Sequence, residues 1–217
     1  QSVALCSECG TPVISDPGAN LIKCCYENGI QVVPIPGPSA IIAALSVCGL
    51  NVVDRFAFEG FLSANAKLRS KRLLELARVE QYELQLCSSG SKQAEEFDDS
   101  KSEPSVEGNY FTRSIVFYES PDRISLLLAD LITIFGTERR ACVAREITKV
   151  FEEVQQGTLG QLLNNYFPSN KKHLGEFTVI LEGTNKFGIG SFSTGSDSSS
   201  SAEKVVAKAA KKKNKKE

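Results

Sequence analysis

The chain of 217 residues contains 41% hydrophobic residues, 25 lysines and arginines and 26 acidic residues, which gives a formal net charge of −1. A chain of this length can bury one or two cores, and its balanced charge excludes a protein that coats nucleic acid with a uniformly basic surface. The charge is segregated, because residues 88–107 carry six acids and two lysines whereas residues 202–217 carry seven lysines and two glutamates. No apolar run approaches the length of a membrane span, so we expect no membrane partner.

The amino-terminal region predicts two consecutive strand–turn–helix units. An apolar run at residues 3–6 predicts a buried strand, and residues 21–29 predict the helix that follows it. A second strand is expected at residues 31–35 and a second, apolar helix at residues 41–48. This order of elements is typical of an α/β domain with a parallel sheet.

Two turns rich in glycine and proline connect these strands to these helices. The first is GTPVISDPG at residues 10–18, and the second is PGPSA at residues 36–40. Glycine lets a ligand approach the backbone closely, and open α/β sheets bind ligands beyond the carboxyl ends of their strands. We therefore expect both turns to lie side by side at one edge of a sheet and to form part of a ligand site, although an ordinary connecting loop is the alternative interpretation.

From residue 56 onward the pattern predicts a second α/β domain. Strands are expected at residues 55–59, 114–118, 140–144 and 177–182, and helices at residues 66–77, 121–135 and 158–165. Residues 88–113 are polar and acidic, with too little apolar surface to offset the entropy of ordering them, so we expect a disordered insertion. The predicted domains are residues 1–55 and 56–184, followed at residues 185–217 by a Ser/Gly-rich and then lysine-rich tail that we also expect to be disordered.

A cluster of charged residues follows the third strand of this domain, in the sequence AREITK at residues 144–149. In an extended chain Arg145 and Lys149 share one face and Glu146 points to the other. Such a cluster is typical both of an active-site rim and of a plain solvated surface, and both interpretations stay open. In the functional interpretation the two cations bind phosphate groups and Glu146 orients or deprotonates a hydroxyl group.

The sequence gives little support to a metal centre. Cys6 and Cys9 have C-x-x-C spacing, but neither a second pair nor a suitable histidine completes a zinc site. His173 is the single histidine of the chain, which argues against a catalytic triad built on histidine. We expect no metal ion.

Six motifs occur in an order that resembles one family. They are SDPG, PGPSA, FEGFL, FYESPDR, AREITK and GEFTVILEG, which begin at residues 15, 36, 58, 117, 144 and 175. The set is similar to the tetrapyrrole methylase-like, or class III, S-adenosylmethionine methyltransferases, and within them to the small-subunit ribosomal RNA methyltransferase I type. The resemblance implies a two-domain α/β fold whose second domain has a mixed sheet. The first strand, glycine-containing turn and Asp-Thr-Arg segment of that family have no counterpart here, so we expect an incomplete amino-terminal domain.

The resemblance also implies a function. It is transfer of a methyl group from S-adenosylmethionine to the ribose 2′-hydroxyl of a cytidine in small-subunit ribosomal RNA. Two alternatives stay open: a tetrapyrrole- or diphthine-type methyltransferase of the same fold, and a truncated homologue that binds RNA without turnover. By analogy we expect a homodimer, located in the cytoplasm if the protein is bacterial or in a chloroplast or mitochondrion if it is eukaryotic, and not secreted.

Three kinds of site residue are expected, and those that contact the donor are given by the resemblance alone. Those expected to contact the methyl donor between the two domains are Glu8, Cys9, Gly10, Val13, Ser39, Ala40, Tyr118, Glu119 and Ala144. Those expected to act in catalysis are Arg145, Glu146 and Lys149. Those expected to bind RNA are Lys67, Arg69 and Arg123. The family usually has Ser-Asp-Ala-Gly-Thr-Pro where this chain has SECGTP at residues 7–12, so Glu8 keeps the charge on a longer side chain and Cys9 adds a sulfur.

Overall fold

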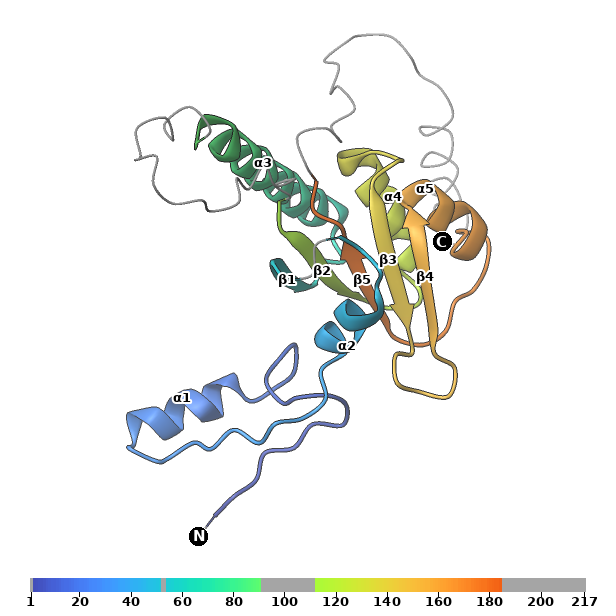
Figure 1. The fold of residues 1–217 in the computed structure, drawn as a ribbon. Helices are drawn as coiled ribbons and strands as arrows, with labels where there is room; N and C mark the ends of the chain where they lie inside the picture. Colours follow the sequence, from blue (N-terminus) through green and yellow to red (C-terminus); the bar gives the residue numbers. More distant parts are fainter. Residues whose placement is uncertain (1, 52–53, 91–111, 185–217) are drawn as a thin grey trace, which may run out of the picture.

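The computed structural model describes residues 2–51, 54–90 and 112–184, and its centre is one five-stranded mixed sheet (Figure 1). The strands lie in the order β1-β2-β5-β3-β4. Their bounds are Phe56–Phe61 for β1, Ser114–Glu119 for β2, Arg140–Arg145 for β3, Glu153–Thr158 for β4 and Phe177–Leu181 for β5. β1 and β2 are parallel, and the other neighbouring pairs are antiparallel. The mixed sheet expected for the second domain is therefore confirmed.

Four of these strands lie close to where the sequence predicts them, and β4 is the exception. β4 has the sequence EVQQGT, lies at one edge of the sheet and is at most half-buried along its length. An edge strand with one exposed face does not need the apolar alternation by which a strand is recognised in a sequence. The strand β5 is the opposite case, because all five of its residues are buried.

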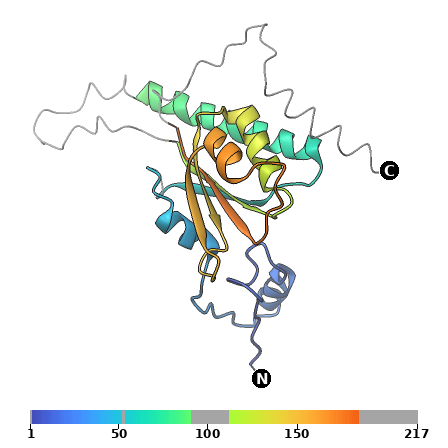
Figure 2. The ribbon, with the colours of Figure 1, turned by 90° about the vertical axis from the view of Figure 1, so that its right-hand side faces the viewer.

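Helices cover both faces of the sheet (Figure 2). On one face lie α3 (Ala66–Gly90), α4 (Ile124–Phe135) and the short α5 (Leu159–Gln161), which continues into the π-helical turn η1 (Leu162–Tyr166). On the other face lies α2 (Ala40–Val47). None of the helices in the described parts of the chain is both long enough and apolar enough to cross a membrane.

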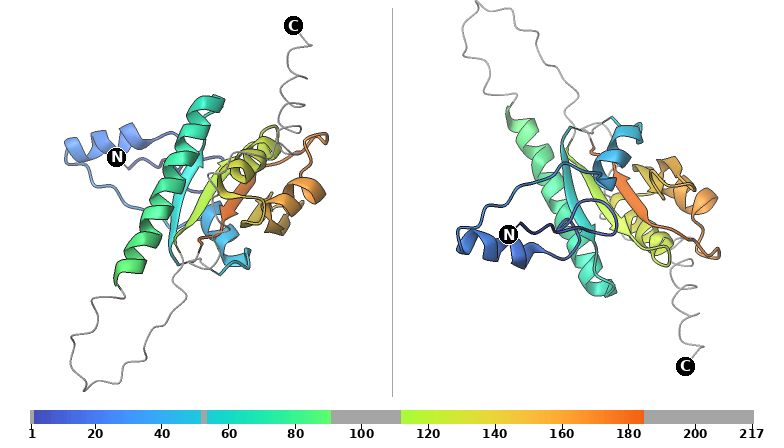
Figure 3. Two further views of the ribbon diagram at one scale, coloured as in Figure 1. Left: turned by 90° about the horizontal axis from the view of Figure 1, so that it is seen from above. Right: turned by 90° about the horizontal axis from the view of Figure 1, so that it is seen from below.

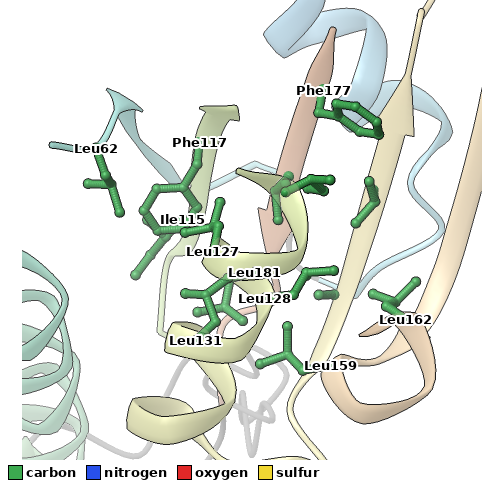
Figure 4. Close-up of a cluster of buried hydrophobic side chains, with 14 of the residues drawn as sticks. Leu62, Ile115, Phe117, Leu127, Leu128, Leu131, Leu159, Leu162, Phe177 and Leu181 are labelled. Atoms are coloured by element: carbon green, nitrogen blue, oxygen red, sulfur yellow. The ribbon is translucent and has the colours of Figure 1, made fainter. Parts of the chain in front are cut away.

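The larger core lies between the sheet and α4 (Figure 4). Leu127, Leu128 and Leu131 of α4 are almost completely buried, and they pack against side chains of the neighbouring strands. Burial of one such leucine stabilises the folded chain by about 1.5–3 kcal/mol. The strand residues in this core are Ile115, Phe117, Ala141, Val143, Phe177, Val179 and Leu181.

The smaller core lies between the opposite face of the sheet and α2. Ile41, Ala44 and Leu45 of α2 pack on the strand residues that alternate with those of the larger core, which are Val116, Cys142, Ala144 and Ile180. The amide groups of Asn51, just beyond this helix, both donate hydrogen bonds to the carboxylate of Glu182, at 2.7 and 2.9 Å. The helix α2 is thus packed on the sheet of the second predicted domain, while the boundary at residue 55 stays a prediction.

The two strands expected at residues 3–6 and 31–35 are not formed, which corrects the prediction of a parallel sheet in the amino-terminal region. A strand exists through hydrogen bonds to a neighbour, and among the described residues no segment pairs with either run. Val3 and Ile35 are accordingly 90% and 81% exposed. The helix α1 (Ala19–Glu27) forms close to its predicted position, but it has no buried residue and stands apart from the sheet (Figure 3).

The structure also changes the limits of the predicted insertion at residues 88–113. The helix α3 continues to Gly90 instead of ending at residue 77. At the other end Thr112 is buried, donates its main-chain N–H to the oxygen of Thr184 at 2.8 Å and its hydroxyl to Glu80 of α3 at 2.9 Å. Residues 91–111 of the predicted insertion and the predicted tail at 185–217 lie outside the described residues.

Replacement of Gly183 by alanine should destabilise the fold, because the new Cβ would collide with the main-chain oxygen of Thr112. We expect Gly183→Ala to lower the free energy of unfolding by about 1–3 kcal/mol, as overpacking does. Gly37→Ala is the matched control, since the nearest atom to its Cβ is 4.0 Å away. Urea denaturation followed by circular dichroism measures both, and equal stability of the two variants would contradict the close approach of residues 112 and 183.

Candidate active site

The two glycine- and proline-rich turns meet, as the sequence predicts. The hydroxyl of Thr11 in the first turn donates a hydrogen bond to the main-chain oxygen of Pro38 in the second, at 2.8 Å. A Cβ placed on Gly10 would lie 3.8 Å from the same oxygen. The hydroxyl of Ser7 donates to the main-chain oxygen of Gly10 at 2.9 Å and closes the first turn. The predicted donor-binding residues of the two turns are therefore neighbours, although no sheet carries them.

Left-handed backbone is concentrated in two segments of the described chain. Its non-glycine residues with positive φ are Val13 at 76° and Ser15 at 57° in the first turn, and Glu146 at 48° and Thr148 at 64° in the AREITK segment. A β-branched residue in this conformation is unfavourable, and such strain is concentrated at functional sites. Both segments are ones that the sequence predicts to belong to the site.

Tyr118 links the second turn to the sheet. It lies near the end of β2, and its ring packs against the smaller core, which contains Ile41 in the first turn of α2. Burial raises the pKa of Tyr118, the main-chain amide of Ile41 offsets part of that rise, and the nearby side chains of Cys9 and Glu176 add to it. Ser39 occupies the N-cap position of α2 without a capping hydrogen bond from its hydroxyl. Tyr118 is therefore packed beside the helix that follows the second turn.

The AREITK segment is a turn and not an extended chain, which corrects the alternation predicted for it. The strand β3 ends at Arg145, and the chain reverses to pair β3 with β4. The main-chain N–H of Lys149 donates to the oxygen of Glu146 at 2.9 Å. Its ammonium lies 3.0 Å from Oε1 of Glu146 and 2.7 Å from Oε2 of Glu176. Lys149 and Glu146 are thus brought together, whereas the predicted extended chain would place them on opposite faces.

The contacts between Glu146, Glu176 and Lys149 shift the pKa values of this cluster toward the charged forms. The main-chain N–H of Glu176 donates to Oε1 of Glu146 at 2.9 Å, and this bond and the ammonium of Lys149 lower the pKa of Glu146. The carboxylates of Glu176 and Glu146 raise the pKa of Lys149. Since a carboxylate of lowered pKa is a weaker base, the cluster is suited to orienting a polar group more than to accepting a proton.

Arg145 and Cys9 attach further segments to the cluster. The guanidinium of Arg145 donates to the main-chain oxygen of Leu174 at 2.7 Å and to the carboxylate of Glu153 in β4 at 3.1 Å. The thiol of Cys9 lies 4.0 Å from Oε2 of Glu176. The first turn, the AREITK turn and the residues before β5 therefore converge.

The sequence analysis did not single out Glu176. It belongs to the GEFTVILEG motif, which is the signal that would have identified it. Its partners are Cys9, beside the first turn, and Glu146 and Lys149 in the AREITK turn. These residues are far from Glu176 in the sequence, so their proximity is visible only in the folded chain.

Glu119 and Arg123 form a pair of their own. The carboxylate of Glu119 is buried, accepts the main-chain N–H of Ser120 at 2.7 Å and lies 2.7 Å from the guanidinium of Arg123. Arg123 also donates to the main-chain oxygen of Leu62 at 3.1 Å. The side chain of Glu119 therefore holds the loop after β2, and the guanidinium of Arg123 joins that loop to the end of β1.

The remaining predicted residues differ in exposure. Glu8 is exposed, Val13 and Ala40 are half-buried, and Ala144 is buried beneath α2. Lys67 is exposed at the start of α3. Within the described ranges no three or more histidine, cysteine, aspartate or glutamate side chains gather in a way that would hold a metal ion.

Arg69 is buried and paired, unlike Lys67 two residues before it. Its side chain is 3% exposed, its Nε donates to Asp130 of α4, and its guanidinium donates to the main-chain oxygens of Ser63 and Ala64 at 3.2 Å. The guanidinium thereby joins α3, α4 and the loop after β1. Of the two cations predicted on this helix, Lys67 is the one accessible to a ligand.

A cavity of about 190 Å³ lies between β1 and α3, and none of the predicted site residues lines it. Arg72 and Glu59 form an ion pair at 2.8 Å there, and Arg113 pairs with Glu83. These charges neutralise one another, so the cavity offers little to a charged ligand.

Removal of the Glu146 carboxylate should abolish a pH-dependent part of the stability. A carboxylate whose pKa is lowered by folding stabilises the protein above its ordinary pKa of 4.5, and that contribution is lost as the pH falls through the lowered value. The melting temperature of Glu146→Gln should therefore lie below that of the wild type at about pH 7 and approach it toward about pH 3. A difference that stays constant over this range would show that the carboxylate is not held as described.

Removal of the Arg69 guanidinium should destabilise the fold and not merely alter its surface. Arg69→Met leaves Asp130 without its partner, and breaking a buried pair in this way should cost roughly 3 kcal/mol of unfolding free energy. Lys67→Met is the matched control, because exposed side chains contribute little. Thermal and urea denaturation of the two variants would decide, and equal losses would contradict the burial of Arg69.

The sequence matches one protein family and several curated relatives. Residues 1–163 match the family of Tetrapyrrole (Corrin/Porphyrin) Methylases. Proteins named Ribosomal RNA small subunit methyltransferase I from Xylella fastidiosa, Vibrio cholerae and Synechocystis are 43%, 38% and 40% identical, over 84% of this chain and 55%, 52% and 53% of their own lengths. The chain thus spans about half the length of these curated relatives. The solved methyltransferase CobJ aligns with a TM-score of 0.49 and 15% identity over 80% of this chain and 62% of its own.

The family match covers both converging turns, β1 to β4 and the AREITK turn. Five of the six motifs that carry the resemblance lie within the matched residues, GEFTVILEG being the exception, and the chain belongs to the tetrapyrrole (corrin/porphyrin) methylase family.

Proposed function

We propose that this chain is part of an S-adenosylmethionine-dependent methyltransferase that modifies a ribose 2′-hydroxyl of a cytidine in small-subunit ribosomal RNA. Family membership supports methyl transfer, and the names of the relatives support small-subunit ribosomal RNA as the substrate. The observation that carries the proposal is the convergence of the two turns with Tyr118 and with the cluster of Glu146, Lys149 and Glu176. A protein that methylates ribosomal RNA acts where ribosomes are assembled, which is the cytoplasm of a bacterium, and the homodimer expected by analogy belongs to the same proposal.

The residues present fit the methyl donor. S-adenosylmethionine carries a sulfonium and an ammonium group, and the exposed Glu8 offers a carboxylate to such cations. Gly10 has a φ of 74°, and its missing side chain leaves the backbone of the first turn bare beside Pro38. When bound, the donor supplies an electrophilic methyl group. The residues that would hold it are Glu8, Cys9, Gly10, Val13, Ser39, Ala40, Tyr118 and Ala144, with Glu119 contributing its main chain because its carboxylate is engaged.

The remaining task of the chain is to position the acceptor hydroxyl. Glu146 is ionised at neutral pH and would accept a hydrogen bond from that hydroxyl, which fixes its direction of attack. Lys149 holds Glu146 in place and neutralises part of its charge. Arg145 uses some of its five N–H donors on Leu174 and Glu153, and the others would bind a phosphate beside the target nucleotide. Lys67 would add a second, exposed phosphate contact.

A homologue that binds RNA without turnover is the second candidate. The observation that favours it is the state of residues 2–38, whose predicted strands have no partner among the described residues and most of whose large apolar side chains are exposed. The first turn is consequently held by few contacts, and donor binding needs a more rigid wall. Calorimetric titration with S-adenosylmethionine distinguishes the two candidates, because a homologue without turnover need not bind the donor.

Substitution of the catalytic cluster should impair chemistry more than donor binding. In a chimera that carries the amino-terminal segment of the Xylella fastidiosa relative ahead of this chain, Arg145→Ala and Glu146→Gln should each reduce methyl transfer by about a hundredfold or more. Donor affinity should change by less than about threefold, since neither residue is assigned to the donor. The assay is transfer of labelled methyl groups to undermethylated small ribosomal subunits.

The exposed Arg78 of α3 provides the control. Arg78→Ala should keep the rate of the parent chimera. If Arg145→Ala and Glu146→Gln keep it too, the AREITK turn is a solvated rim and the catalytic assignment is wrong.

A further inference from the structure

An irregularity in β1 places two phenylalanine rings on the same face of the sheet. β1 pairs with β2 in regular register up to Phe58, and the register shifts before Gly60, whose φ is 62°. Without this bulge Phe58 and Phe61 would point to opposite faces, because they lie three residues apart in a strand. With it, Phe58 pairs with Val116 and Phe61 with Tyr118, which both point to the face that α2 covers.

The three rings form one aromatic platform, which we define as Phe58, Phe61 and Tyr118. The ring centroids of Phe58 and Tyr118 are 4.9 Å apart in an edge-to-face contact, and those of Phe61 and Tyr118 are 5.6 Å apart. The rings of Phe58 and Tyr118 also pack against the smaller core under α2. Phe61 nevertheless remains 54% exposed. The platform is therefore preorganised at its inner side and open at its outer ring.

The aromatic platform lies beside the first turn. A Cβ on Gly60 would lie 3.3 Å from the hydroxyl oxygen of Ser15 and 3.8 Å from the ring of Phe58. Ser15 is one of the left-handed residues of that turn, so the bulge and the strained turn meet. The exposed ring of Phe61 therefore contacts Tyr118, which is itself a residue of the candidate active site.

We infer that the aromatic platform stacks the base of the nucleotide to be methylated, with Phe61 as its outer surface; this rests on the proposed function. Proteins bind unpaired RNA bases by stacking them on aromatic side chains. The methyl donor also has a planar base, but a small ligand is usually buried over most of its surface. A ring that is half exposed on an edge strand is better suited to a polymer, and the exposed Lys67 lies six residues further along the chain.

The absence of tryptophan from the sequence allows a direct spectroscopic test. In Phe61→Trp of this chain, the single indole would report on stacking through quenching of its fluorescence. We expect quenching by a short single-stranded RNA that contains cytidine, and little by an oligomer of the same length whose central nucleotides lack bases. Phe56→Trp is the matched control, because Phe56 is 38% exposed on the same strand but at its opposite end, and its fluorescence should not respond.

Binding measurements complete the test. At fixed salt concentration, Phe61→Ala should weaken RNA binding by about tenfold or more, Phe61→Tyr should retain it, and Phe56→Ala should resemble the wild type. Melting temperatures and sedimentation confirm that each variant is folded and in the same oligomeric state. A Phe61→Ala variant that changes oligomeric state without a loss of RNA affinity would overturn the inference, and so would quenching of Phe61→Trp by both oligomers alike.

The outcomes separate this inference from the proposed function. Quenching by S-adenosylmethionine but not by RNA would assign the platform to the adenine of the donor, which overturns the inference and leaves the methyltransferase proposal standing. Base-dependent quenching and weakened RNA binding, in a protein whose chimera transfers no methyl group, would support the platform and contradict the proposed reaction.

Discussion

The central strand β5 is buried on both faces, and this double burial fixes the position of the candidate site. Val179 and Leu181 point into the core under α4, while Ile180 points into the core under α2. Because α2 follows directly after the second turn, its packing on β5 determines where that turn lies relative to β2 and β3. The first turn is then placed through Thr11 and Pro38, and through the contact of Ser15 with Gly60. The two turns of the candidate site are thus positioned by a core to which they do not belong.

The cluster around Lys149 shows how a strained turn can be held by electrostatics. Glu146 has a positive φ, which costs of order 1 kcal/mol or more. Its carboxylate accepts the amide of Glu176 and the ammonium of Lys149. Charged hydrogen bonds of this kind offset such a cost. The same bonds lower the pKa of Glu146, so the geometry that fixes the turn also makes this carboxylate a poor proton acceptor.

Elements whose residues are buried could be predicted from the sequence, and elements defined by pairing could not. α4 is apolar along the side that faces the sheet, so its helical periodicity located it, and β5 was located as a short run that is apolar except for Thr178. β4 is polar and half-buried, and it is a strand only because β3 lies beside it. The runs at residues 3–6 and 31–35 have the composition of strands but find no neighbour among the described residues. Composition measures the tendency to be buried, whereas a hydrogen-bonded ladder depends on residues far away in the sequence.

The candidate site follows the same division. Motifs located the two turns and the AREITK segment, because glycine, proline and clustered charge are local signals. Asp130 is 61 residues away from Arg69, and Leu62 is 61 residues away from Arg123, so these two contacts were not visible in a local pattern. The bulge at Gly60 could be predicted only in part. The FEGFL motif contains the glycine, but only the register with β2 shows that Phe58 and Phe61 share a face. Since one residue of slip reverses the side of every later residue in a strand, a single glycine in β1 decides whether Phe61 faces the candidate site or the opposite core.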